Sequence, residues 1–211
     1  MKKLLFFFVG LALISCSNDE SNDNSGETTN SVAFFKANVG GQTLNYIQDN
    51  SNNPAYFNEI NIGYNGQGFE KSYYYGANMV TLSSVDYYPS LDLTMHNMYQ
   101  SNNEADETTN FNNSFAVKPT TFISYAQDGN WIKGVSVTYI KANGDRYSTL
   151  AGSQPNSSIM YNTGIASTSQ FGLQRQTITG TVTCRLYNEN DVNDVLELTN
   201  GSFKLIFEEF N

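Results

Sequence analysis

A strict two-residue alternation from residue 177 to residue 186 constrains this chain more than any other feature of its sequence. Small and apolar residues occupy one parity, at Ile178, Gly180, Val182, Cys184 and Leu186. Threonines and one arginine occupy the other parity. Because successive side chains of a β-strand point to opposite faces, this pattern predicts a strand with one face in a core and the other in water. The same parity predicts that Cys184 is a buried, inert thiol.

Shorter runs of the same kind, separated by turn residues, fill most of the chain. The expected strands are residues 32–39, 42–48, 57–64, 73–82, 90–99, 120–126, 131–141, 145–150, 177–187 and 195–207. Gly40-Gly41 and Asn143-Gly144 are signals typical of tight hairpins. Residues 101–113 are expected to form a long polar loop, and no segment has a sustained helical period. Many short strands predict an all-β domain, an antiparallel β-sandwich with a partly open β-barrel as the alternative.

Composition supports one folded domain and excludes some partners. The chain has 211 residues, of which 14% are aromatic and only 15% are charged, unlike a disordered protein. Its net charge of −9 makes nucleic acid a poor partner. Residues 32–211 are long enough to bury a core without disulfides.

The first sixteen residues carry the most specific motif. Lys2 and Lys3 precede an apolar stretch that ends at Ile14, and this stretch is too short to span a bilayer. Residues 1–15 are therefore expected to be a secretory signal peptide. The segment Leu13-Ile14-Ser15-Cys16 resembles the lipobox of bacterial lipoproteins. That resemblance implies cleavage before Cys16 and lipidation of Cys16, whose acyl chains would hold the protein on a membrane. An ordinary signal peptide with a chance cysteine is the alternative.

Residues 16–31 are polar and acidic and are expected to form a flexible tether. The segment Ser17-Asn18-Asp19-Glu20 resembles the acidic export signal of surface lipoproteins in Gram-negative bacteria. The resemblance implies an outer-membrane protein that faces the cell exterior. A plain acidic linker on a protein that faces the periplasm is the alternative.

Two further segments resemble the opening and closing parts of small, uncharacterised all-β lipoprotein families. The opening segment is Phe35-Lys-Ala-Asn-Val-Gly-Gly41, and the closing hairpin contains Ile178-Thr-Gly-Thr-Val182 and Leu198-Thr-Asn-Gly-Ser-Phe203. This similarity implies an all-β domain and carries no activity.

Residues that could perform catalysis or bind metal are few. The single histidine, His96, shares a strand face with Asp92 and Thr94, and no nucleophile elbow is present, so an enzyme is not expected. A hydrolase that uses Asp86, Asp92 or Asp128 stays a lesser alternative. Cofactors are not expected. A weak calcium candidate is the loop that contains Asn188, Glu189, Asn190, Asp191 and Asp194.

Surplus aromatic residues give the remaining functional hypothesis. Tyr73, Tyr75 and Trp131 are candidate ligand-binding residues, because exposed rings beside amides suit stacking on sugars or on a protein partner. Ordinary cross-strand packing is the alternative. The sequence therefore predicts a non-catalytic binding or interaction module that captures glycan or peptide or acts in adhesion, with another envelope protein as a possible partner. A structural or protective lipoprotein without a small-molecule ligand is the runner-up.

Overall fold

A computed structural model describes residues 31–52, 54–65, 71–81, 89–99, 107–116, 121–123, 134–162 and 164–209. The expected signal peptide, Cys16 and residues 17–30 of the tether lie outside these residues. The elements are β1 (Ala33–Val39), β2 (Gln42–Gln48), β3 (Tyr56–Asn65), β4 (Lys71–Thr81), β5 (Ser90–Tyr99), α1 (Glu107–Ala116), β6 (Gly134–Ile140), β7 (Arg146–Ser148), η3 (Thr149–Ala151), β8 (Ser158–Tyr161), β9 (Ile165–Thr168), β10 (Gln174–Asn188) and β11 (Val195–Glu208).

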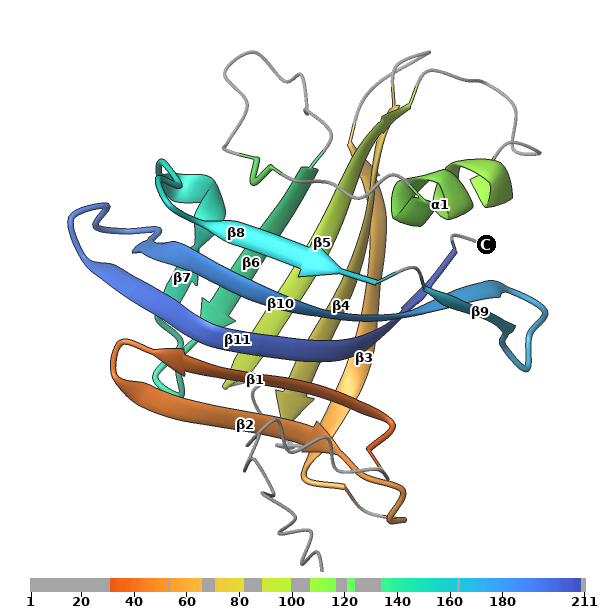
Figure 1. Cartoon of the computed structure of the whole chain (residues 1–211), viewed down its shortest axis with the longest axis horizontal. Helices are drawn as coiled ribbons and strands as arrows, with labels where there is room; N and C mark the ends of the chain where they lie inside the picture. The colour runs from red at the N-terminus through yellow and green to blue at the C-terminus, as the bar shows by residue number, and fades with distance from the viewer. Residues whose placement is uncertain are drawn as a thin grey trace, which may run out of the picture.

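The strands of the described residues all belong to one antiparallel sheet, which confirms the all-β prediction. The sheet order is β2-β1-β11-β10-β7-β6-β5-β4-β3, and β8 and β9 pair with β10 beside this path. In Figure 1 the strands β2, β1, β11 and β10 cross in front of β3, β4, β5 and β6. The sheet thus curls into a barrel-like shape with one seam, between β2 and β3. This corresponds to the partly open barrel among the expected architectures.

A side-chain clasp bridges the sheet near this seam, between β3 and β11. The Nδ2 atom of Asn58 donates to the carbonyl of Ile206 at 2.9 Å, and Oδ1 of Asn58 accepts from the Ile206 amide at 2.9 Å. Gln48 accepts from the Asn58 amide at 2.9 Å. The side-chain carboxamide of Asn58 therefore takes the place of a neighbouring strand at Ile206, where β1 no longer pairs with β11.

The core lies inside the curled sheet and follows the parity seen in the sequence. Ile178, Val182, Cys184 and Leu186 are at most 2% exposed, which confirms the inward face of β10. Burial raises the pKa of the Cys184 thiol, as expected of an inert thiol. Phe35, on β1, belongs to the same core.

One element departs from the sequence expectation at residues 101–113. Residues 107–116 form helix α1, where a polar loop was expected. Its apolar residues are only Phe111 and Phe115 with a terminal alanine, too few to show a helical period. Both phenylalanines are buried, with ring centroids 5.0 Å from Tyr75 and Phe207 respectively. Tertiary packing therefore selects this helix, rather than its intrinsic propensity.

Other boundaries also differ from the prediction. The expected strand 120–126 is reduced, within the described residues, to one parallel bridge between Phe122 and Val135. The short strands β8 and β9 were not predicted. The two hairpin signals are confirmed: Gly40 and Gly41 have φ of 56° and 84°, values open to glycine, and they join β1 to β2.

A β-bulge bends β11 in the middle of the sheet. Asn38 pairs with Thr199, but Lys36 pairs with Ser202, so β11 has one extra residue relative to β1. The same extra residue shifts the pairing of β10 with β11 between Val182 and Cys184. Asn200, at φ 51°, lies within this bulge. Bulges re-aim side chains, and this one turns the strand at the place where a surface groove forms.

Candidate functional site

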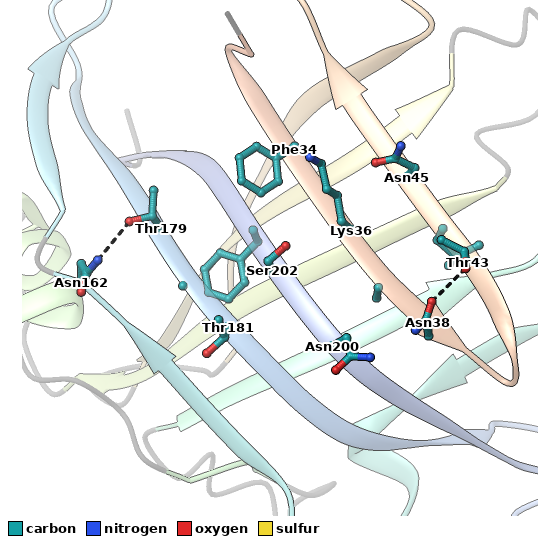
Figure 2. Close-up of a pocket in the computed structure, with 14 residues that line it drawn as sticks. Phe34, Lys36, Asn38, Thr43, Asn45, Asn162, Thr179, Thr181, Asn200 and Ser202 are labelled. Atoms are coloured by element: carbon teal, nitrogen blue, oxygen red, sulfur yellow. Dashed lines mark hydrogen bonds between the residues drawn. The ribbon is translucent and has the colours of Figure 1, made fainter. Parts of the chain in front are cut away.

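A groove crosses the outer face of β2, β1, β11 and β10. We call it the outer groove; its labelled residues in Figure 2 are Phe34, Lys36, Asn38, Thr43, Asn45, Asn162, Thr179, Thr181, Asn200 and Ser202. Its volume is about 680 Å³. Ligand sites commonly have roughly 300–1,000 Å³, so the outer groove is large enough for a small ligand or a short segment of a polymer.

Strand register arranges the polar side chains of the outer groove in rows. Lys36 pairs with Asn45 on β2 and with Ser202 on β11, and Ser202 pairs with Thr181 on β10. These four residues therefore form one line across four strands, perpendicular to the chain direction. Asn200 lies beside this line because of the bulge in β11 (Figure 2).

Several polar side chains of the outer groove have unused hydrogen-bonding capacity. The hydroxyl of Thr43 donates to Asn38 Oδ1 at 2.9 Å, and Asn162 Nδ2 lies 3.5 Å from the Thr179 hydroxyl. By contrast, the side chains of Asn45, Thr181, Asn200 and Ser202 make no hydrogen bond to any described residue. These side chains supply both donors and acceptors to the solvent that fills the outer groove.

Lys36 gives the outer groove a positive charge in an acidic protein. Its ammonium lies 5.0 Å from the ring centroid of Phe34, which faces the same side of β1 and is 5% exposed. The cation therefore sits over an aromatic ring at the edge of the polar row (Figure 2).

Of the aromatic residues selected from the sequence, only Tyr75 has a described side chain, and it does not line the outer groove. Tyr75 was expected to be available for stacking, but it is 1% exposed and its ring makes an edge contact with Phe111. This part of the prediction is wrong, because residues 107–116 cover the ring from inside the barrel. Tyr73 lies in β4, but its side chain lies outside the described residues, as does Trp131.

The loop proposed for calcium is held by hydrogen bonds within its own region. Asp194 accepts from the Tyr147 hydroxyl at 2.5 Å and from Asn188 Nδ2 at 3.1 Å. Asp191 accepts from the amide of Asn193 at 3.0 Å. Across the described part of the chain, no group of three histidine, cysteine or acidic side chains converges as a metal site would require. Glu189 and Asn190 of the same loop lie in the hairpin between β10 and β11, where Glu189 pairs with Arg146 at 2.8 Å.

The single histidine lies with two polar neighbours on the outer face of β5, as the sequence predicted. His96 Nε2 lies 2.8 Å from the Ser136 hydroxyl. The Asp92 carboxylate accepts instead from Thr94, at 2.6 Å, so the carboxylate does not orient the imidazole. These contacts do not form the chain of base and orienting group that a serine triad needs. Asp86 and Asp128, the other carboxylates considered for hydrolysis, lie outside the described residues.

The outer groove was missed by sequence reasoning although its residues had a signal. Thr179 and Thr181 occupy the polar parity of residues 177–187, and Lys36 and Asn38 occupy the polar parity of β1. The sequence did not reveal that β1 and β10 flank the same strand, because those two segments are more than a hundred residues apart.

Comparison with protein-family models, curated proteins and solved structures finds no match to this chain. Within the described residues, no helix is both long and apolar enough to cross a membrane.

Proposed function

We propose that this protein is a lipid-anchored envelope protein that captures a glycan, without catalysis, in the outer groove. The observation that carries the proposal is the row of Asn45, Lys36, Ser202 and Thr181 across four strands. Three of these side chains make no hydrogen bond to another described residue. Sugar hydroxyls both donate and accept hydrogen bonds, so amide and hydroxyl side chains in a fixed row suit them.

Rigidity favours binding at this place. All four residues belong to strands, so little backbone freedom is lost when a ligand is held. The long antiparallel pairing of β10 with β11 fixes Thr181 relative to Ser202, and β1 fixes Lys36 on the other side. Lys36 adds a cationic donor, which favours glycans that carry a carboxylate.

The proposed anchor would hold this site near a membrane. In the proposal, the signal peptide of residues 1–15 is removed and Cys16 is lipidated. A flexible tether of residues 16–31 would then allow a root-mean-square separation of roughly 20–25 Å between the lipid and the domain. Asp19 and Glu20 would direct the protein to the outer surface of the outer membrane, where a glycan is accessible.

The test is glycan-array binding by the acyl-free protein that starts at Ser17, followed by titration of any hit. The Thr181→Val variant keeps the side-chain shape and removes the hydroxyl. It should weaken binding about fivefold to tenfold, since one hydrogen bond contributes ~1 kcal/mol. Thr177→Val is the matched control, because Thr177 lies on the same face of β10 but outside the outer groove.

Three outcomes would count against the proposal. Absence of binding to any glycan would favour the structural or protective lipoprotein. Equal losses for both threonine variants would place the ligand elsewhere. Acyl-free protein in cells that carry an intact Cys16 would contradict the anchor, and mass spectrometry of the N-terminal peptide measures this directly.

A further inference from the structure

A second hollow lies on the outer face of the opposite part of the sheet, over β3, β4, β5 and β6. Register places Glu59, Asn78, Asp92 and Thr138 in one row across these strands. In the next row, Gly76 stands between Asn61 and Thr94. A hollow of about 440 Å³ lies over these two rows, with Asn61, Asn78, Asp92 and Thr94 among the residues that line it; it is called the Gly76 hollow after the glycine between Asn61 and Thr94.

Two neighbouring acceptors at this hollow receive few hydrogen bonds from the protein. The side-chain carbonyl oxygen of Asn78 is buried and accepts no hydrogen bond from a described residue. Its cross-strand neighbour Asp92 accepts one from the Thr94 hydroxyl at 2.6 Å, and no other described side chain donates to this carboxylate. Buried acceptors without donors are unfavourable, so a bound donor would stabilise both residues.

The basic side chains that line the hollow do not provide that donor. Arg146 pairs through its Nε with Glu189 at 2.8 Å and donates no hydrogen bond to Asp92. His96 is held against the Ser136 hydroxyl, and burial lowers the pKa of its imidazole to about 4, so the ring is neutral near pH 7. Glu59 adds a further carboxylate, 3.5 Å from Asn78 Nδ2.

An aromatic ring completes the wall. Tyr74 lies in the row next to Gly76, and its ring centroid is 6.4 Å from that of His96. Aromatic rings attract organic cations, so this ring adds to a cation-binding environment in the same hollow.

We propose that the Gly76 hollow binds the protonated primary amine of a small ligand, between the Asn78 carbonyl oxygen and the Asp92 carboxylate. An ammonium has three donors and one positive charge. It therefore matches two neighbouring acceptors, one of them anionic, better than a neutral hydroxyl does. This site lies on different strands from the outer groove, and the inference does not depend on glycan binding there.

Protonation of Asp92 would compete with such a ligand. Burial raises the pKa of this carboxyl to about 6; the Thr94 hydrogen bond and Arg146 oppose the shift, and Glu59 adds to it. His96, which also lines the hollow, stays neutral through the same range. Amine binding should therefore weaken as the pH falls from 7.5 to 5.

The experiment titrates the full protein with n-butylammonium and, separately, with n-butanol, and follows the backbone amide resonances of residues 76, 78, 92 and 94 by NMR. Butylammonium should shift these resonances in a saturable manner, and butanol should not. Asp92→Asn should weaken butylammonium binding at least about tenfold, because it removes the charge and keeps the shape. Glu197→Gln is the matched control, since Glu197 is an exposed acid on β11.

A second variant keeps the test informative if Asp92→Asn perturbs folding. Gly76→Ala would place a Cβ atom 3.2 Å from both Asn61 Cβ and Thr94 Oγ1, so these two side chains, which line the hollow, would have to shift without any change of charge. Three results would overturn the proposal. They are equal resonance shifts with butanol, unchanged butylammonium affinity in both Asp92→Asn and Gly76→Ala, and an equal loss of affinity in Glu197→Gln. Thr181→Val should leave amine binding unchanged, so this result and the glycan result are independent.

Discussion

On the outer face of β1, β2, β10 and β11, polar side chains stand in solvent, whereas on the outer face of β4, β5 and β6 similar groups are buried. Asn45 and Thr181 in the outer groove are exposed, while Ser136 and Thr138 are 2% and 5% exposed. Solvation satisfies the first set at no cost. The second set must find partners in the protein, and Asn78 and Asp92 find fewer than they can accept. The comparison teaches that exposed polar side chains on a β-sheet are satisfied by water. Buried ones that lack partners lower the stability of the fold.

The largest expected effect on stability comes from comparing side chains on the inner and outer faces of β4. Tyr75→Ala should lower the free energy of unfolding by about 3–5 kcal/mol, because it removes a buried ring packed on Phe111. Tyr74 on the same strand faces the Gly76 hollow and is only partly buried. Tyr74→Ala should therefore have less than half this effect in urea unfolding. Similar losses for both variants would contradict the inward position of Tyr75.

The next effect tests the buried carboxylate. Asp92→Asn should raise the free energy of unfolding at pH 7.5 by about 2–3 kcal/mol, because burial raises the pKa of Asp92 to about 6, above its unfolded value of about 3.9. The wild-type protein gains stability from the proton on Asp92 below about pH 4, and loses it as the pH rises through 6.

The difference in the free energy of unfolding between Asp92→Asn and the wild-type protein should accordingly shrink to about zero at pH 4. Urea unfolding between pH 4 and pH 7.5 measures this difference. His96 has the opposite sign, since its lowered pKa gives stability that is lost as the pH falls from about 6.5 toward 4. The comparison between variant and wild type at each pH cancels this contribution. A constant difference from pH 4 to pH 7.5 would contradict the burial of an ionised Asp92.

A smaller effect is expected at the seam. Asn58→Ala removes both side-chain hydrogen bonds to Ile206 and should lower the free energy of unfolding by about 1–3 kcal/mol. Asn61→Ala is the control, because Asn61 is exposed on the same strand and its side chain makes no hydrogen bond to a described residue. Its effect should lie within about 0.5 kcal/mol. Amide hydrogen exchange at Ile206 should accelerate in the first variant only.

The smallest effect belongs to the outer groove. Thr181→Val should change the free energy of unfolding by no more than about 0.5 kcal/mol, since Thr181 is exposed. Thermal unfolding measures this change, with Thr177→Val as the control. A large loss of stability would show that the Thr181 hydroxyl is structural, and would remove it from the proposed glycan site.

Local patterns in the sequence predicted the hairpins and the inward parity of β10, because turn chemistry and two-residue alternation act between neighbours. They also placed Asp92, Thr94 and His96 on one face. They could not predict that Asn78 is the cross-strand neighbour of Asp92, because that neighbour depends on the register between two strands. The Gly76 hollow requires three such registers, and α1 depends on contacts with Tyr75 and Phe207 from distant strands.

The position of β11 has a consequence for the order in which the chain can assemble. Strand β11 lies between β1 and β10, so the β1–β2 hairpin reaches its neighbour in the sheet only through residues 195–208. Synthesis proceeds from the N-terminus, so β1 can pair with β11 only after residues 195–208 have emerged. The first hairpin is left with an unpaired edge until then, and folding is bound to be late and non-local. A ribosome-stalled chain that ends before residue 195 should stay sensitive to protease, and one that exposes residue 209 beyond the exit tunnel should become resistant.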